Sequence, residues 1–166
     1  MELIEDTDWS DVDDMENCGD ACSASGGAYD REEFFSRDFP SCVQDTPIHI
    51  KEFLILLVSV KLWGHKWARK KVIIRCDNDA VCDTILLQKP SDEKLQACLR
   101  ELLFWQCRYN FSLSVQKIGT KENFLADFIS RCTNTTQIEQ FFNSHNVPAK
   151  RCVTVPDEMF QFSGDW

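Results

Sequence analysis

The chain has 166 residues, of which 43% are hydrophobic and 27% are charged, a composition that fits one folded domain and excludes wholesale disorder. The formal net charge is −9, but ten of the 27 acidic residues lie within the first 30 positions, which contain no Lys or Arg. The remaining positions carry 17 acidic and 18 basic residues, so the acidity belongs to the N-terminal segment and the rest of the chain is close to neutral.

Targeting signals and cysteines indicate the compartment. There is no run of about 18 apolar residues, and the N-terminus lacks the basic and apolar parts of a signal peptide. We therefore expect an intracellular protein, in the cytoplasm or nucleus, that is neither secreted nor embedded in a membrane. Nine cysteines without repeated CxxC spacing indicate free thiols. Cys18 and Cys22 are spaced like half a zinc site, but no second pair matches them.

The N-terminal third predicts few regular elements. Residues 1–17 are acidic, and we expect them to be mostly irregular. The pair Gly26-Gly27 predicts a tight turn or a bulged hairpin. The phenylalanines within 28–39 supply apolar bulk for a strand, which Pro40 ends.

The stretch 49–64 has the clearest pattern in the chain. Its apolar residues recur at helical spacing and cover most of the circumference, which predicts a buried helix that stops at Gly64. The β-branched run within 70–77 predicts a strand covered on both faces. Later patterns predict helices over 80–87 and 93–109, a strand over 111–118, and a short helix from the cap Asn123 through Cys132. This order of elements is typical of an α/β fold with helices covering a central sheet.

Four acidic residues occupy positions where chemistry could take place, and each has a simpler structural interpretation. Asp77 directly follows the buried strand, where open α/β sheets keep their sites, although Asp77 or Asn78 could merely cap the next helix. Glu52 lies near the start of the buried helix and could interact favourably with the positive end of the helix dipole. Asp127 could lie on a solvated helix face, and Asp20 could be a turn residue. If folding brings the four together, they match the carboxylate cluster that a pair of divalent cations requires.

A basic cluster and two tryptophans have two interpretations each. The cluster could bind phosphates through counterion release, or it could be a solvated helix end and loop. Trp63 fits the core, because it lies on the apolar helix, and Trp67 could be a core residue or a stacking platform. The basic cluster comprises Lys61, Lys66, Arg69, Lys70 and Lys71.

Three sequence blocks occur in order: Leu62-Trp63-Gly64, the stretch RCDNDAV at 75–81 and the stretch ENFLADFISR at 122–131, preceded by DACSASGGAY at 20–29. Together these blocks resemble the ribonuclease H domain of retroelement reverse transcriptases, in particular of the DIRS-like retrotransposons with tyrosine recombinases and of the gypsy-type polyproteins. The resemblance covers residues 18–166, and the polymerase part of such proteins is absent.

The resemblance implies a ribonuclease H-like fold. Its five-stranded mixed sheet would consist of an antiparallel meander of three strands plus two strands parallel to the first, with helices flanking the sheet. The domain would span 18–132, after the irregular segment 1–17 and before a C-terminal extension, 133–166.

The resemblance also implies a function. Asp20, Glu52, Asp77 and Asp127 would hold two Mg²⁺ or Mn²⁺ ions and hydrolyse the RNA strand of an RNA/DNA hybrid, leaving a 5′ phosphate and a 3′ hydroxyl. A polymerase domain would be supplied in trans, and the oligomeric state is not indicated. The residues expected to contact nucleic acid are Asn78, Asn123, Lys66, Arg69, Lys70, Lys71 and Lys117.

Two departures from the family pattern leave alternatives open. Residues 13–19 are polar where the family's first strand is apolar, so Asp6 or Asp8 are fallbacks for Asp20. Lys117 stands where the family often has a histidine, whose titration near neutral pH a lysine cannot reproduce. The alternatives are a catalytically inactive remnant that binds nucleic acid or a protein partner, and a scaffold with the same fold and no nucleic-acid contact.

Overall fold

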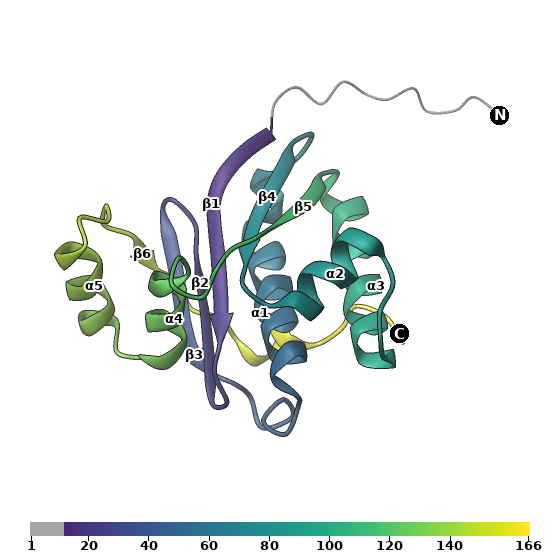
Figure 1. Ribbon diagram of the computed structural model, residues 1–166, viewed down its shortest axis with the longest axis horizontal. Coiled ribbons are helices and arrows are strands. Elements are labelled where there is room, and N and C mark those ends of the chain that lie inside the picture. Colours follow the sequence, from purple (N-terminus) through teal and green to yellow (C-terminus); the bar gives the residue numbers. More distant parts are fainter. Residues whose placement is uncertain (1–11) are drawn as a thin grey trace.

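The computed structural model describes residues 12–166, which form a mixed six-stranded sheet with helices on both faces (Figure 1). The strands follow the order β5-β4-β1-β2-β3-β6 across the sheet. The strands are β1 (Val12–Ala21), β2 (Ser25–Tyr29), β3 (Glu33–Asp38), β4 (Lys71–Cys76), β5 (Ser112–Lys117) and β6 (Arg151–Cys152). The helices are α1 (Ile48–Trp63), α2 (Asp79–Leu87), α3 (Glu93–Tyr109), α4 (Phe124–Arg131) and α5 (Thr135–Ser144), with 3-10 turns at Gly64–Lys66 and Asp157–Phe160.

Strand directions agree with the expectation for the first five strands. β1, β2 and β3 form an antiparallel meander, β4 runs parallel to β1, and β5 runs parallel to β4. The prediction of five strands is wrong, because the short strand β6 joins the sheet parallel to β3. The backbone N–H groups of Arg151 and Val153 donate to the carbonyls of Glu32 and Phe34, both at 2.8 Å.

Strand β1 begins earlier than the sequence predicts. Residues 1–11, including the fallback candidates Asp6 and Asp8, lie outside the described part of the chain. Val12–Asn17 were expected to be irregular, but they belong to β1, which pairs with β2 on one side and β4 on the other. The register shifts after Asp13, and Glu16 has a φ of 53°. Pairing with β4, through Val12, Asp13 and Asn17, thus outweighs the low strand propensity of this acidic stretch.

The paired glycines lie inside strand β2 and not in a turn. The reversal falls at Cys22–Ala24, where the N–H of Cys22 donates to the carbonyl of Ser25 at 2.8 Å. A Cβ on Gly26 would collide with Ile55 of α1, and a Cβ on Gly27 would collide with Ile129 of α4. The turn prediction was wrong, because the glycines instead let a helix approach each face of the sheet.

Helices α1 and α4 cover opposite faces of the sheet, and α3 packs outside α1. Helix α1 is buried over nearly its whole circumference and ends at Gly64, as predicted. Trp63 is 1% exposed and donates to Glu33 at 3.2 Å, while Trp67 is 0% exposed and packs edge-to-face on Phe111. Both tryptophans therefore belong to the core, and the stacking alternative for Trp67 is wrong.

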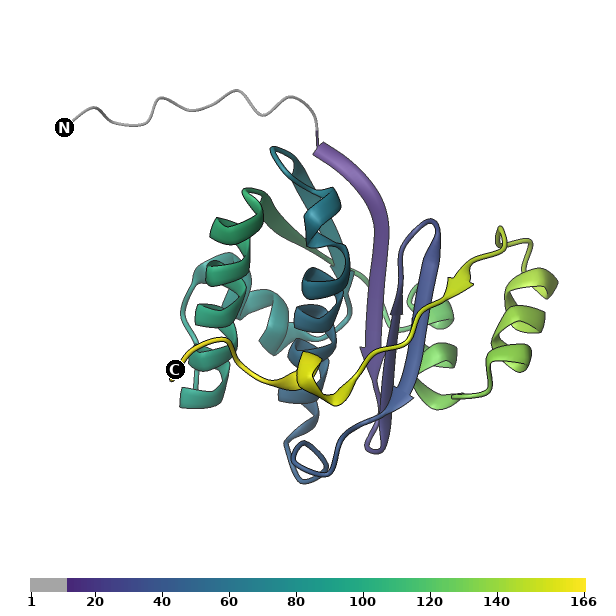
Figure 2. The same cartoon turned by 180° about the vertical axis from the view of Figure 1, so that it is seen from behind.

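The segment 133–166 shares its packing with the rest of the chain. Ile138 and Phe142 of α5 pack with Phe34 of β3 and Ile129 of α4. Beyond β6 the chain crosses α1 and ends beside α3 (Figure 2). None of the described helices is long and apolar enough to cross a bilayer.

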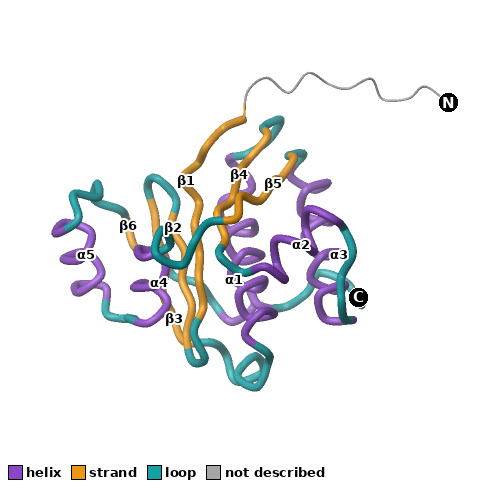
Figure 3. Tube along the Cα trace, in the orientation of Figure 1, coloured by secondary structure: helices purple, strands orange, loops and turns teal. Residues whose placement is uncertain are grey.

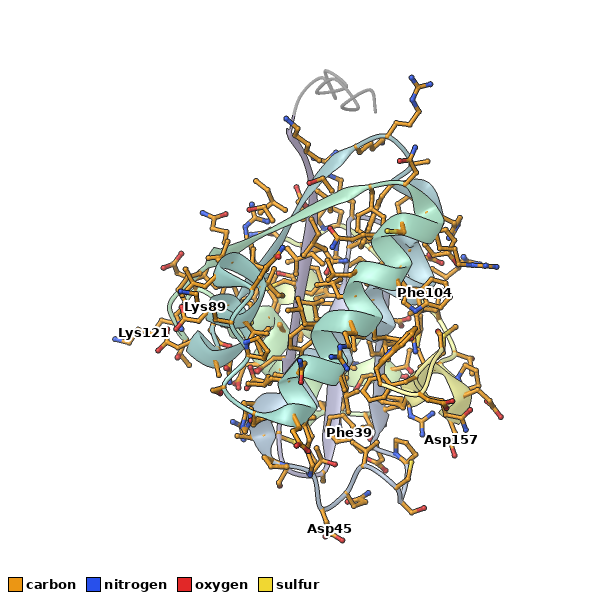
Figure 4. The ribbon with its side chains drawn as sticks, turned by 90° about the vertical axis from the view of Figure 1, so that its right-hand side faces the viewer. Phe39, Asp45, Lys89, Phe104, Lys121 and Asp157 are labelled. Carbon is orange, nitrogen blue, oxygen red and sulfur yellow. The ribbon has the colours of Figure 1, made fainter. Side chains whose placement is uncertain are left out.

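Surface and interior differ as expected for a packed domain. Figure 4 shows the charged side chains of Asp45, Lys89, Lys121 and Asp157 pointing outward.

The loop that joins β5 to α4 runs across the sheet in front of β1, which places α4 on the face opposite α1 (Figure 3).

Candidate active site

All four predicted carboxylates line one pocket of about 530 Å³. Asp20 is the last residue but one of β1, and Asp77 directly follows β4. Glu52 is the fifth residue of α1, and Asp127 lies in the first turn of α4. The structure therefore brings together four side chains that belong to four separate elements.

The sheet topology explains this convergence. β1 and β4 are neighbouring parallel strands, so their carboxyl ends reach the same edge of the sheet, at the bottom of both strands in Figure 1. Asp20 is held firmly there, because it pairs with Gly27 of β2 and its Oδ1 accepts the N–H of Ala21 at 2.9 Å. The polar character of the first strand thus does not leave Asp20 unsupported.

Mutual repulsion shapes the electrostatics of the pocket. Asp20 is 7% exposed. Burial, together with the nearby carboxylates of Asp77 and Asp127, raises the pKa of Asp20 to about 7, against the opposing hydrogen bond from Ala21. A buried aspartate beside two other acids is stable in its charged form only if a cation joins it.

Glu52 has similar electrostatic surroundings. Burial and the charges of Asp20 and Asp77 raise its pKa to about 8, while Asn78 and Lys117 oppose the shift. Its Oε2 atom is buried and has no hydrogen-bond partner among the described residues. An unpartnered carboxylate oxygen in a group of acids is the donor set that a hard divalent cation prefers, so these residues fit such an ion.

Within residues 12–166, the group of possible metal ligands whose donor atoms lie close together consists of Glu52, Asp77 and Cys76, and it does not include Asp20 or Asp127. One donor atom from each lies within 4.8 Å of the other two. Cys76 is the last residue of β4 and was not considered at the sequence level, where only its neighbour Asp77 stood out. Its thiol is buried and hydrogen-bonds with the thiol of Cys82, which raises its pKa, so the carboxylates are the better donors for Mg²⁺.

The two asparagines expected to contact nucleic acid have structural roles. Asn78 caps α2, since its side chain accepts the N–H of Val81 at 3.1 Å, as the simpler interpretation proposed. Asn123 is 1% exposed; it accepts from the thiol of Cys18 at 2.7 Å and makes no side-chain cap bond. Asn123 is therefore buried beside Cys18, and its contact with nucleic acid stays a prediction.

Most of the basic cluster lies away from the pocket. Lys71 begins β4 and Asp77 follows its other end, so they are separated by roughly 20 Å of extended chain. Lys70 and the exposed Arg69 precede Lys71 at that far end. Lys66 is paired with Asp30 and Glu33 at 3.4 and 3.3 Å. The expected basic surface thus lies at the N-terminal end of β4, and the carboxylates lie at the C-terminal end of the same strand.

Lys117 is the member of the predicted set that lies beside the pocket. Its ammonium group donates to the carbonyl of Asp77 and lies 2.9 Å from a carboxylate oxygen of Asp79. It is exposed at the end of β5, next to β4. These contacts place a positive charge, paired with Asp79, beside Asp77 at the C-terminal ends of β4 and β5.

Sequence reasoning missed two cationic residues of the pocket. Lys51 is 4% exposed and donates to the carbonyls of Ser23 at 2.5 Å and Gln44 at 2.7 Å, which ties the β1–β2 turn to the start of α1. Arg131 is exposed and lies 3.0 Å from Asp127. The i,i+4 spacing of Asp127 and Arg131 was the available signal, whereas Lys51 gave none.

Comparison with known proteins gives no independent assignment. No model of a known protein family matches the chain, and no curated protein is significantly similar to it. The site must therefore be interpreted from its own geometry.

Proposed function

We propose that the chain is a ribonuclease H-like nuclease domain, derived from a retroelement reverse transcriptase, that hydrolyses the RNA strand of RNA/DNA hybrids. The observation that carries the proposal is the pocket lined by Asp20, Glu52, Asp77 and Asp127. A meander followed by two strands parallel to β1 supports the ribonuclease H-like fold, to which β6 is an addition.

The carboxylates are suited to holding two Mg²⁺ or Mn²⁺ ions. When bound, such a pair activates the attacking water and stabilises the leaving 3′ oxygen. The chain's own residues bring four acidic side chains from separate elements to one pocket, and Asp20 is fixed there by pairing and by its bond from Ala21. Lys117 and Arg131 offer positive charge to phosphates beside the carboxylates. Preference for RNA would come from contacts with 2′ hydroxyls in the wide minor groove of a hybrid.

The proposal predicts Mg²⁺-dependent cleavage of a labelled RNA/DNA hybrid. Asp77→Asn should lower the rate by about 10³-fold, because a metal ligand supplies several kcal/mol of transition-state stabilisation. Asp83→Asn is the matched control, since Asp83 is an exposed aspartate on α2, and it should cut at the wild-type rate.

Two results would favour the alternatives. A wild-type protein that binds the hybrid in a salt-dependent manner without cutting it would be the inactive remnant. A wild-type protein that neither binds nor cuts would be a scaffold with the same fold. Equal cleavage by Asp77→Asn and the wild type would also contradict the assignment of the site.

A further inference from the structure

A buried amide lies between strand β1 and helix α1, in a cavity that Glu52, Leu56 and Ser59 of the helix also line. Asn17 is a residue of β1, pairs with Ile74 of β4 and is 0% exposed. Neither its Nδ2 nor its Oδ1 has a hydrogen-bond partner among the described residues. Folded proteins rarely bury an amide in this way without a bound group that satisfies it.

Asn17 and Glu52 share a small cavity. Its volume is about 10 Å³, close to that of a single water probe, and it lies between α1 and strands β1 and β4. Among the described residues, Glu52 is the one that lines both this cavity and the larger carboxylate pocket, and its Oε2 is the buried oxygen without a partner. The cavity is lined by Asn17, Gly19, Glu52, Leu56, Ser59, Ile74, Arg75 and Cys76.

The unsatisfied atoms match the bonding of one water molecule. A water can donate one proton to Glu52 Oε2 and the other to Asn17 Oδ1, and it can accept a bond from Asn17 Nδ2. Three bonds is the usual number for a buried water, and the space admits nothing larger.

We propose that Asn17 is a positioning residue, which acts through one buried water to orient the Glu52 carboxylate toward the carboxylate pocket. With Oε2 bonded to the water, Oε1, which has Asn78 as a neighbour, is the oxygen that would bind an ion. The inference rests on the proposed function, in which Glu52 is a metal ligand. Asn17 touches neither substrate nor metal, so it acts only through Glu52.

Asn17→Leu tests the role, because leucine is close to asparagine in size and has no polar atoms. The full chain should still unfold cooperatively, but its Mn²⁺ affinity should fall by about 10-fold, as for other groups that orient a metal ligand. Ile74→Val is the matched control in the same cavity wall and should leave the affinity unchanged. Asn17→Ser, which keeps a polar group, should recover most of the affinity. Asn17→Ala, which also has no polar side-chain atom, takes the place of Asn17→Leu if that variant does not fold.

A crystal structure of the full chain at high resolution provides the second readout. It should show one water within hydrogen-bond distance of Asn17 and Glu52. Wild-type Mn²⁺ affinity in Asn17→Leu, or a dry cavity, would overturn the inference. These outcomes differ from failure of the proposed function, in which the wild type binds Mn²⁺ and does not cut hybrids.

Discussion

Two glutamates on the packed helices α1 and α3 stand in opposite surroundings. Glu101 of α3 is 0% exposed and accepts hydrogen bonds from Ser163 N at 2.8 Å, Trp105 Nε1 at 2.8 Å and Trp166 Nε1 at 2.9 Å. Lys61 lies 3.4 Å from it. Burial alone would raise the pKa of Glu101, but these donors lower it on balance. Glu52 of α1 has an unpartnered oxygen and a pKa raised to about 8.

The contrast separates an acid with a full set of donors from an acid that would hold a cation under the proposed function. The donors around Glu101 come from α1, α3 and the C-terminal segment. Their hydrogen bonds hold the C-terminal segment against the two helices. Around Glu52, burial and the charges of two neighbouring aspartates raise the pKa more than the hydrogen bond with Asn78 and the charge of Lys117 lower it. The same residue type thus stabilises the fold at one place and is left unsatisfied at the other.

The largest expected effect separates the two glutamates by stability. Glu101→Gln should lower the free energy of unfolding by about 3 kcal/mol, because it leaves a buried cluster of donors without their charged acceptor. Glu52→Gln should leave the metal-free protein at least as stable as the wild type at about pH 8, since it removes repulsion. Urea denaturation of both variants measures the difference.

The two variants should show the reverse order in their loss of nuclease activity. Glu52→Gln should abolish hybrid cleavage, whereas Glu101→Gln should retain it at temperatures well below its unfolding transition. Similar losses of stability in both variants would show that Glu52 is an ordinary structural acid.

The pH dependence of stability sharpens the comparison. Asp20 and Glu52 have folded-state pKa values of about 7 and 8 against ordinary values of 3.8 and 4.5, so the folded state binds more protons than the unfolded state between these limits. Their contribution to stability is therefore present at low pH and is lost as the pH rises toward 8. Metal-free protein should melt a few degrees lower at about pH 8.5 than at about pH 5.5.

Mg²⁺ should reverse that loss, because it binds the deprotonated carboxylates and only the folded state assembles them. Glu101 does not contribute in this range, since its lowered pKa confines its effect to more acidic pH. Thermal melts at the two pH values, with and without Mg²⁺, provide the measurement. A melting temperature that rises with pH in the metal-free protein would be inconsistent with the shifted carboxylates.

The elements with strong local signals were predictable from the sequence. The bounds of α3, Glu93–Tyr109, were predicted correctly, because Asp92 caps its start and Asn110 ends it with a φ of 55°. Helix α1 was clear from its all-round apolar pattern. The site carboxylates were found through the resemblance and their positions next to buried strands.

The elements that were missed depend on contacts distant in the chain. β1 is polar and exists because two neighbours pair with it, and β6 is two residues long and needs β3. The glycines of β2 were misassigned to a turn, because only the packed helices reveal why they are needed. Asn123 was expected to cap α4, but its side chain bonds Cys18, 105 positions earlier.

The smallest expected effect tests which end of strands β4 and β5 binds the nucleic acid. Lys117→Ala should weaken hybrid binding and reduce the slope of log affinity against log salt by about 1. Lys71→Ala, at the other end of β4, should leave the slope unchanged. Fluorescence anisotropy of a labelled hybrid over a range of salt concentrations measures both, and an effect confined to Lys71→Ala would move the binding surface to the opposite edge.

The occupancy of the pocket by metal is the most direct test of the account. Crystals of the full chain soaked in Mn²⁺ at about pH 8, where Asp20 and Glu52 lose their protons, should show two anomalous peaks among Asp20, Glu52, Asp77 and Asp127. Saturating Mn²⁺ that leaves the pocket without a peak would contradict the account.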